Sequence, residues 1–239
     1  MFNTEKIVVV TPTYNERENI GTLIEQVFKL GIPNLEMFVV DDNSPDGTAA
    51  VVEELSHHYA VRLLRRSTKM GLGSAYRDAF LHVLEDPDVA FVLQMDADLS
   101  HDPRAIPQFL AAIRNADLVL GSRYMLGGRV ENWATTRRLI SRFGCWYSRI
   151  MLGLPHSDLT GGYKCWRREV LERIPFDSIS SIGYNFQVET TWWAYKMKSR
   201  ISEIPIVFSE RTIGKSKFNV RIMCESFFKV LALRIRKQQ

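Results

Sequence analysis

The sequence from Val89 to Pro103 reads VAFVLQMDADLSHDP and joins an apolar run to a pair of acidic residues. The run Val89–Leu93, rich in β-branched and aromatic residues, predicts a buried strand. Because side chains two apart in an extended chain point to the same side, Asp96 and Asp98 should aim together out of the strand's C-terminal end. Open α/β sheets bind their ligands at that end. The stretch therefore predicts an α/β fold with a ligand site at the carboxyl edge of its sheet.

The composition of this acidic pair indicates what it binds. Two converging carboxylates without His or Cys ligands suit a hard divalent cation, either Mg²⁺ or Mn²⁺. Such a cation keeps most of its coordination shell for water and substrate phosphates. The alternative is that the aspartates only cap a helix that begins at Pro103. We favour a metal–diphosphate site with Asp96 and Asp98 as the metal ligands.

Composition limits the class of protein. The chain has 239 residues, an ordinary globular composition and a formal net charge of +4, which alone does not imply nucleic acid. Its three cysteines are far apart, which predicts neither a zinc site nor a disulfide framework and fits a reducing, cytoplasmic setting. No apolar run approaches the roughly 20 residues that span a bilayer, and no signal peptide precedes the first strand. We therefore expect a chain that does not cross a membrane.

Strand and helix patterns alternate through the first half of the chain. Five strands are predicted, at Lys6–Thr11, Met37–Val40, Val61–Leu64, Val89–Met95 and Leu118–Gly121. The helices between them are expected at Glu16–Leu30, through Val51, Val52 and Leu55, at Gly73–Leu84 and at Ala105–Arg114. Such alternation predicts a mostly parallel sheet that helices cover on both faces.

The second half is less regular. Its predicted elements are helices near Arg137–Leu152, Glu169–Ile174 and Phe186–Met197, a strand at Ile204–Phe208, and a last helix from Val220. Neither a linker nor an internal repeat divides the chain. We therefore expect residues 1–239 to form a single domain.

The turns after the first two strands exclude two common classes of site. The first turn, Pro12–Glu16, has no glycine, whereas a dinucleotide-binding fold places Gly-x-Gly-x-x-Gly there. The second turn, Asp41–Thr48, superficially resembles a calcium loop, but Val52 stands where the bidentate Glu should be. Its Asp, Asn, Ser, Pro and Gly are ordinary turn residues, so alone this segment favours a structural role.

Seven motifs in order give a more specific indication. Four resemble the GT-A glycosyltransferases of family two: Pro12-Thr13-Tyr14-Asn15-Glu16, Asp41-Asp42-x-Ser44-x-Asp46-Gly47-Thr48, Lys69-x-Gly71-Leu72-Gly73 and Asp96-Ala97-Asp98-Leu99-Ser100-His101-x-Pro103. Three more resemble the dolichyl-phosphate (polyprenyl-phosphate) mannosyltransferase branch of that family: Gly121-Ser122-Arg123-Tyr124, Asp158-Leu159-Thr160-Gly161-Gly162-Tyr163 and Arg211-x-x-Gly214-x-Ser216-Lys217. The resemblance implies a GT-A (Rossmann-like) fold, with a nucleotide-binding half at about 1–122 and an acceptor-binding half at about 123–239.

The resemblance also implies an activity. It is the inverting transfer of mannose from GDP-mannose to dolichyl or polyprenyl phosphate, which gives polyprenyl phosphate mannose. Two alternatives stay open. The chain could be a transferase that uses UDP-glucose or another sugar nucleotide, with a lipid-phosphate or soluble acceptor. It could also be a non-catalytic subunit that binds a nucleotide sugar.

Site residues follow from the resemblance position by position. The donor-binding set would be Pro12, Tyr14, Glu16, Val40, Asp42, Asp96, Ala97, Asp98, Arg123, Arg211 and Lys217. Within it, the residues implied in catalysis are Asp98, Arg123, Arg211 and Lys217. Arg137 and Ser141 would meet the acceptor phosphate, while Asp96 and Asp98 would hold the metal.

The chemistry of a phosphate acceptor fits the residues present. A divalent cation and fixed Arg or Lys side chains can stabilise the negative charge that develops on a leaving diphosphate. A phosphate monoester is already largely ionised at neutral pH, so it needs positioning by cations more than a general base. The chain has no Gln-x-x-Arg-Trp, the signature of processive polysaccharide synthases in the same superfamily. A lipid phosphate is the acceptor consistent with this pattern.

Arg137–Leu152 has the pattern of an amphipathic helix on the acceptor side. Its apolar face carries Leu139, Phe143, Trp146 and Ile150, and a separate stripe carries Arg138, Arg142 and Arg149. A broad apolar face beside arginines suits contact with both a lipid chain and its head group. Packing of the same face on the protein core explains the pattern equally well.

The C-terminal helix is the second candidate for lipid contact. In Val220–Lys237 one face carries Val220, Met223, Cys224, Phe227, Leu231 and Ile235, with basic residues at the end. Without a spanning helix, the chain would reach a lipid acceptor as a peripheral protein at the cytosolic face of a membrane, or through a small membrane subunit. The alternative is a helix that closes the domain, with cations favoured near its C-terminus.

Overall fold

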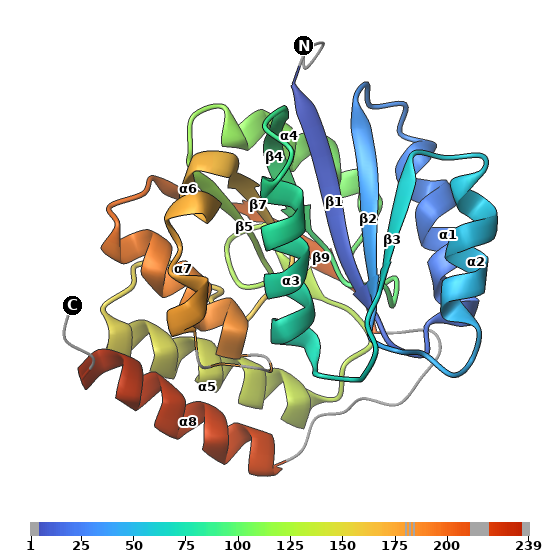
Figure 1. The fold of residues 1–239 in the computed structure, drawn as a ribbon. Helices are drawn as coiled ribbons and strands as arrows, with labels where there is room; N and C mark the ends of the chain where they lie inside the picture. Colours follow the sequence, from blue (N-terminus) through green and yellow to red (C-terminus); the bar gives the residue numbers. More distant parts are fainter. Residues whose placement is uncertain (1–4, 180, 182, 184, 211–219, 236–239) are drawn as a thin grey trace.

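The central feature of the computed structural model is a seven-stranded sheet in the order β3-β2-β1-β4-β7-β5-β8 (Figure 1). The structure describes residues 5–179, 181, 183, 185–210 and 220–235, and only the backbone of 220–226. The strands are β1 (Lys6–Thr13), β2 (Leu35–Asp41), β3 (Val61–Arg65), β4 (Val89–Gln94), β5 (Leu118–Ser122), β6 (Arg129–Val130), β7 (Lys164–Arg167), β8 (Ile201–Pro205) and β9 (Val207–Phe208). The helices are α1 (Arg17–Phe28), α2 (Thr48–Ser56), α3 (Leu72–Leu84), α4 (Ile106–Ile113), α5 (Thr135–Leu152), α6 (Arg168–Arg173), α7 (Asn185–Lys196) and α8 (Val220–Ile235), with short 3₁₀ turns at Pro103–Ala105 and Phe176–Ser178.

The sheet is parallel except for one strand. β7 runs antiparallel to both of its neighbours, β4 and β5, while the other pairs are parallel. The five strands predicted in the first half are confirmed. The single strand predicted at Ile204–Phe208 is wrong, because this region forms the end of β8 and the separate strand β9, which pairs with β6. β6 and β7 were not predicted.

The alternation of side chains along β1 builds a core on each face of the sheet. Ile7 and Val9 pack in a cluster with apolar residues of α1 and α4. Val8 and Val10 point the other way into a cluster with α3. Because both faces are buried, the strands are continuous apolar runs, as expected for a parallel sheet between helices. The predicted mostly parallel α/β fold is confirmed.

A third apolar cluster joins the helices of the second half. Leu152 of α5, Trp192 of α7, and Val230 and Leu233 of α8 are among its buried residues. α5 and α8 lie side by side along one end of the molecule (Figure 1). Both halves of the sequence also supply strands to the one sheet, because β7 and β8 belong to it. The division into a nucleotide-binding and an acceptor-binding half stays a prediction.

Candidate active site

The carboxyl ends of β1 and β2 bring several predicted donor-binding residues together. Pro12 lies opposite Val40 in the register of the two strands, and Tyr14 and Glu16 follow in the next turn. The turn after β2 braces this turn, because Ser44 Oγ accepts a hydrogen bond from the Asn15 amide at 2.9 Å. Thr48 Oγ1 accepts another from the Glu16 amide at 3.0 Å. The structural role expected for Asp41–Thr48 is thus present.

Asp42 organises a third segment at the same edge. Its buried carboxylate accepts hydrogen bonds from Arg66 Nη1 at 3.0 Å and from the amides of Met70 and Gly71 at 3.0 and 2.9 Å. Lys69 Nζ lies 3.4 Å from the centroid of the Tyr14 ring. Asp42 therefore holds the turn that carries Lys69 against the turn that carries Tyr14. Its predicted contact with the base or ribose stays a prediction.

The acidic pair lies in a turn and not in an extended strand. We call this turn, which contains Asp96, Ala97 and Asp98, the acidic turn. β4 ends at Gln94, and Leu99 has a left-handed φ of 61°. The extended-chain reason for the convergence of the two aspartates is therefore wrong for this segment. Local bonds orient Asp98 instead, since Ser100 donates to its Oδ1 from the amide at 3.1 Å and from Oγ at 2.5 Å.

Two buried rings fix the position of Asp96. Tyr76 of α3 donates its hydroxyl proton to Asp96 Oδ1 at 3.0 Å. Burial and the nearby Asp96 charge raise the pKa of Tyr76 well above its usual value, which keeps the hydroxyl protonated as a donor. His101 Nδ1 accepts a bond from the Asp96 amide at 3.1 Å, and burial lowers the pKa of His101. The ring is therefore neutral and its proton is on Nε2.

The residues of this turn fit a hard cation. Ala97 is buried between the two aspartates, Asp98 is 5% exposed and Asp96 is half-buried. Carboxylate oxygens are the ligands that Mg²⁺ and Mn²⁺ prefer. Among the described residues there is no group of three or more His, Cys, Asp and Glu side chains that could hold a metal. A cation here would thus draw further ligands from water and substrate.

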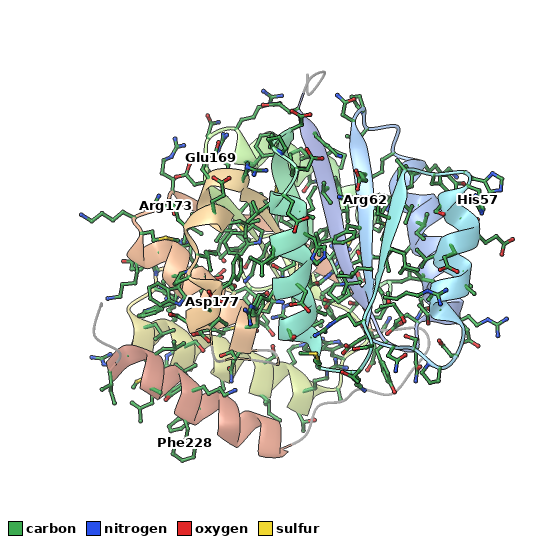
Figure 2. The ribbon with its side chains drawn as sticks, in the orientation of Figure 1. His57, Arg62, Glu169, Arg173, Asp177 and Phe228 are labelled. Carbon is green, nitrogen blue, oxygen red and sulfur yellow. The ribbon has the colours of Figure 1, made fainter. Side chains whose placement is uncertain are left out.

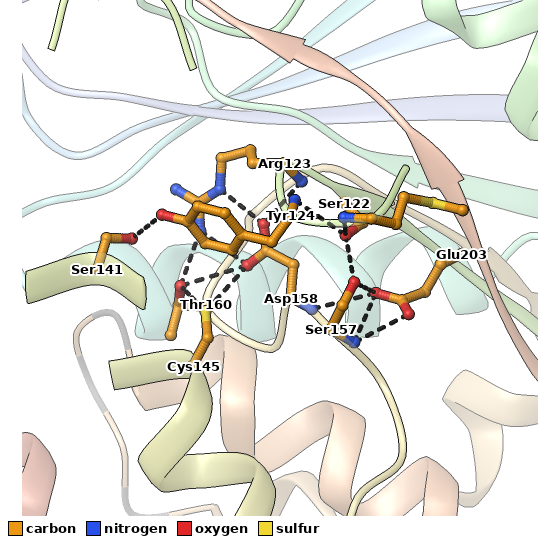
Figure 3. Close-up of polar contacts among 10 residues, drawn as sticks. Ser122, Arg123, Tyr124, Ser141, Cys145, Ser157, Asp158, Thr160 and Glu203 are labelled. Atoms are coloured by element: carbon orange, nitrogen blue, oxygen red, sulfur yellow. Dashed lines mark hydrogen bonds and ion pairs between the residues drawn. The ribbon is translucent and has the colours of Figure 1, made fainter. Parts of the chain in front are cut away.

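Arg123 is held in a buried ion pair (Figure 3). Its Nε and Nη2 donate to the two oxygens of Asp158 at 2.7 and 2.8 Å, and Nη2 also donates to Thr160 Oγ1 at 2.8 Å. The Arg123 amide donates to the same carboxylate at 3.0 Å. Burial alone would lower the pKa of Arg123 and raise that of Asp158, but their pairing reverses both shifts. Nη1 is the guanidinium nitrogen outside these bonds, and the predicted phosphate contact stays a prediction.

A second carboxylate, that of Glu203, holds the loop that carries Asp158. Glu203 of β8 accepts hydrogen bonds from the amides of Ser157 at 2.9 Å and Asp158 at 3.1 Å (Figure 3). Because those amides belong to the loop before β7, the edge strand β8 fixes the loop that holds Arg123. The sequence motif included Asp158, but its spacing did not show its partner.

The two predicted acceptor residues lie near Arg123. Arg137 of α5 pairs with Glu210 at 2.9 Å, and its guanidinium carbon lies 4.0 Å from the centroid of the Trp133 ring. Ser141 Oγ accepts a hydrogen bond from Tyr124 at 2.7 Å. The guanidinium carbon of Arg123 lies 5.3 Å from the centroid of the Tyr124 ring and 5.8 Å from the centroid of the Trp133 ring.

Two predicted residues, Arg211 and Lys217, lie outside the described residues. The chain that leads to them is placed by backbone contacts with the acidic turn. The Ser209 amide donates to the Ser100 carbonyl at 3.3 Å, and His101 forms an isolated antiparallel bridge with Phe208. Their predicted roles remain predictions.

The apolar face of α5 is exposed. Leu139, Phe143, Trp146 and Ile150 are 62%, 54%, 55% and 53% exposed. The buried side chains of the helix are Cys145, Ser148 and Leu152, which lie on its other side. The alternative that this apolar face packs on the core is therefore wrong.

α8 continues this exposed apolar surface. Its Phe227 ring stacks on Tyr147 of α5 at 4.3 Å between centroids, and Phe228 projects away from the protein (Figure 2). Phe228 is 67% exposed, whereas Val230 and Leu233 face the core. We call the side chains Leu139, Phe143, Trp146, Ile150, Phe227 and Phe228 the α5–α8 surface. Among the described residues, no helix is long and apolar enough to cross a membrane.

Comparison with known proteins places the chain in a family. Residues 8–175 match the family described as Glycosyl transferase family 2. The chain is 41% identical over 236 residues to a polyprenol monophosphomannose synthase of Mycolicibacterium smegmatis, which covers 98% of this chain and 88% of that protein. It is 42% identical over 227 residues to an undecaprenyl-phosphate mannosyltransferase of Micrococcus luteus, which covers 94% of this chain and 92% of that protein.

Solved structures agree on the fold. Glucosyl-3-phosphoglycerate synthase from Mycobacterium tuberculosis, in a complex with Mn²⁺, UDP and glucosyl-3-phosphoglycerate, superposes with a TM-score of 0.71. The alignment covers 98% of this chain and 81% of that one at 18% identity. The fold, the match over residues 8–175 and the two close relatives together establish that this chain belongs to glycosyl transferase family 2.

Proposed function

We propose that this protein transfers mannose, with inversion, from GDP-mannose to polyprenyl phosphate. The observation that carries the proposal is the identity of 41% across 98% of the chain with a polyprenol monophosphomannose synthase. The ordered acidic turn supports a catalytic protein over a subunit that only binds nucleotide sugars, because both aspartates are held in fixed positions by other side chains.

Asp96 and Asp98 are the proposed ligands of Mg²⁺ or Mn²⁺. When bound, the cation would offset the negative charge that develops on the leaving diphosphate. Tyr76 orients Asp96 and Ser100 orients Asp98, so the two carboxylates need little reorganisation when the donor binds. Pro12, Tyr14, Glu16, Val40 and Asp42 belong to the proposed nucleotide pocket.

The acceptor phosphate is the proposed nucleophile. One of its oxygens forms a bond to the anomeric carbon of mannose while the bond to GDP breaks and its electron pair leaves with the diphosphate. Arg137 and Ser141 would hold this phosphate near Arg123. The Trp133 ring contacts both Arg137 and Arg123, and Tyr124 contacts both Ser141 and Arg123. Arg211 and Lys217 would add positive charge. The ionised phosphate requires no general base.

The α5–α8 surface would rest on the membrane that holds the acceptor. Its side chains on α5 lie on the same helix as Arg138, Arg142 and Arg149, which suits an interface with anionic head groups. Since α5 also carries Arg137 and Ser141, contact with lipid at this surface would bring the polyprenyl phosphate head group to the reaction site. A small membrane subunit bound here is the other route, at the cytosolic face in both cases.

A matched set of transfer assays tests the proposal. The purified chain is offered GDP-mannose or UDP-glucose with Mn²⁺ or Mg²⁺, and either a polyprenyl phosphate or the same polyprenol without phosphate. We expect sugar to enter the organic phase only with GDP-mannose and the phosphorylated lipid, and excess chelator to abolish it. Equal transfer to the free alcohol would contradict the phosphate nucleophile. Preference for UDP-glucose would contradict the donor.

A further inference from the structure

A buried glutamine of α7 ends beside Asp96, and the nitrogen of its side-chain amide is unpaired within the described residues. Gln187 is 1% exposed, and within the described part of the chain its Nε2 donor has no hydrogen-bond acceptor. An unsatisfied buried donor typically costs about 1–3 kcal/mol, so such a group calls for a physical reason. No motif in the sequence pointed to this residue.

A chain of hydrogen bonds fixes which way this amide faces. Trp166 Nε1, which can only donate, gives its proton to Gln94 Oε1 at 3.2 Å. The amide nitrogen of Gln94 is thereby turned towards Gln187 and donates to its Oε1 at 2.6 Å. The oxygen of Gln187 is therefore committed to Gln94, and its nitrogen points to the other side. The indole thus sets the orientation of both amides.

Gly162 marks the space that the Gln187 nitrogen faces. A Cβ atom at this glycine would lie 3.5 Å from Gln187 Nε2 and 3.3 Å from each carboxylate oxygen of Asp96. Contacts of 3.3 Å are tighter than nine in ten Cβ contacts, so a side chain at this position would crowd the Asp96 carboxylate. An amide donor and a carboxylate acceptor consequently lie within 3.5 Å of one point beside Gly162, next to the proposed metal ligands.

We propose that Gln187 Nε2 and the Asp96 carboxylate bind a hydroxyl group of the donor sugar, which makes Gln187 a specificity-determining residue. A hydroxyl accepts one hydrogen bond and donates another, so it satisfies the amide and the carboxylate together. A diphosphate oxygen only accepts, so it could satisfy the amide but not the carboxylate. The inference rests on the proposed function for the identity of the ligand as a sugar nucleotide.

The test separates the sugar from the nucleotide. Affinities for GDP-mannose and for GDP are measured by calorimetry with Mn²⁺ in the wild type, Gln187→Met and Gln187→Glu. Loss of one hydrogen bond of about 1.4 kcal/mol corresponds to a tenfold change. We expect Gln187→Met to weaken GDP-mannose about tenfold and to leave GDP unchanged. Gln187→Glu keeps an acceptor for Gln94 but replaces the donor, so it should weaken GDP-mannose further.

Thr191→Val is the matched control on the same helix. Thr191 Oγ1 donates to the Gln187 carbonyl at 2.9 Å and accepts from Lys164 Nζ at 2.9 Å, and Thr191 is not among the three atoms nearest a Cβ at Gly162. This variant therefore reports the effect of losing bonds within α7 and β7 while the Gln187 amide is kept. We expect its ratio of GDP-mannose to GDP affinity to equal that of the wild type. Thermal unfolding shows whether each variant is folded. If Gln187→Met does not fold, Gln187→Glu still provides the test, because it keeps an acceptor for the Gln94 amide.

Each contrary outcome has a distinct meaning. An equal loss of affinity for GDP and GDP-mannose would place Gln187 at the nucleotide or in packing, and would overturn the inference. Unchanged affinities would mean that Gln187 does not contact the donor sugar, which also overturns the inference. If the wild type instead binds UDP-glucose and not GDP-mannose, the proposed donor fails. The inference is then decided by the same variants with UDP-glucose and UDP.

Discussion

The acidic turn and the α5–α8 surface are stabilised in opposite ways. In the turn, Asp96 and Asp98 are held by Tyr76, His101 and Ser100 through bonds within the protein. On the α5–α8 surface, apolar side chains such as Phe143 and Phe228 are more than half exposed. Polar groups are thus satisfied at the proposed metal site, and apolar groups are left in water at the proposed membrane contact.

This difference separates the two tasks of the proposed reaction. The turn is organised before its ligand arrives, so binding there requires little rearrangement. The α5–α8 surface is stabilised only when a membrane or another protein covers it, because the transfer of apolar area out of water lowers the free energy. Variants of the turn should therefore change turnover, and variants of the α5–α8 surface should change where the protein acts.

The largest expected effect is on the acidic turn. Asp98→Ala should lower the rate of mannose transfer by about 10³-fold or more, because several kcal/mol of charge stabilisation is lost with the cation. Initial rates at saturating GDP-mannose and Mn²⁺ measure it. Asp88→Ala, an exposed residue just before β4, is the control and should retain full activity. Wild-type rates in Asp98→Ala would remove the metal assignment.

A second large effect should appear in stability. Asp158→Ala leaves the buried Arg123 guanidinium without its bidentate partner, which is expected to cost about 3–5 kcal/mol of unfolding free energy. Urea unfolding measures this loss. Replacing both residues, as Arg123→Met with Asp158→Leu, should restore much of the stability but not the activity. Restored activity in this double variant would exclude any role of Arg123 at phosphate.

A smaller effect is expected on the α5–α8 surface. The double variant Phe143→Ser/Trp146→Ser should bind anionic vesicles about 30-fold more weakly, since the two rings together lose roughly 2 kcal/mol of burial in lipid. Its unfolding free energy should change by less than about 0.5 kcal/mol, because both residues are exposed. Vesicle co-sedimentation measures the binding, with Leu81→Ser on α3 as an exposed apolar control. Equal binding by the double variant and the wild type would exclude the α5–α8 surface as the membrane contact.

A last effect concerns Lys164, the buried first residue of β7. Its Nζ donates to the Gln187 carbonyl at 2.7 Å and to Thr191 Oγ1 at 2.9 Å, and burial lowers its pKa to about 7. Between pH 7 and the usual value of 10.5, the unfolded chain binds the proton and the folded chain does not. Wild-type stability should therefore rise with pH in this window, by at most about 1.4 kcal/mol per unit.

Lys164→Met isolates this contribution. The variant should gain stability relative to the wild type at pH 7, and the gain should shrink towards pH 9. Thermal or urea unfolding of both proteins across that range measures the difference, from which other titrating groups cancel. A difference that is constant with pH would show that Lys164 stays charged when folded.

The sequence predicted the parallel strands of the first half better than the strand β7 that lies between β4 and β5. The β-branched runs of β1, β2 and β4 and the motif around Asp96 are local signals, and both correctly indicated the parallel sheet and the place of the acidic turn. β7 was missed because four residues with a lysine among them show no strand periodicity, although Lys164 is buried by α7. Its antiparallel insertion depends on contacts far apart in the sequence.

The contacts of Tyr76 and Gln187 at the candidate site could not be predicted from the sequence either. Tyr76 occupies an apolar face of α3 and looks like an ordinary core residue, yet its hydroxyl reaches Asp96. Gln187 looks like a solvated helix position until α7 is placed against β7. The apolar stripe of α5 permitted burial or exposure, and only the packing of its opposite side decides which.

The reversed direction of β7 sets a limit on chain length. Because β7 runs against β4 and β5, its first residue, Lys164, pairs with Gln94 and Leu120 near the carboxyl ends of those strands. The segment before it is tied at Asp158 to Arg123 and passes Asp96 at Gly162. Residues 158–164 therefore span a fixed distance between fixed points. An insertion of even one residue there would move Asp158 away from Arg123 or Gly162 away from Asp96, so we expect this segment to keep its length where surface turns vary.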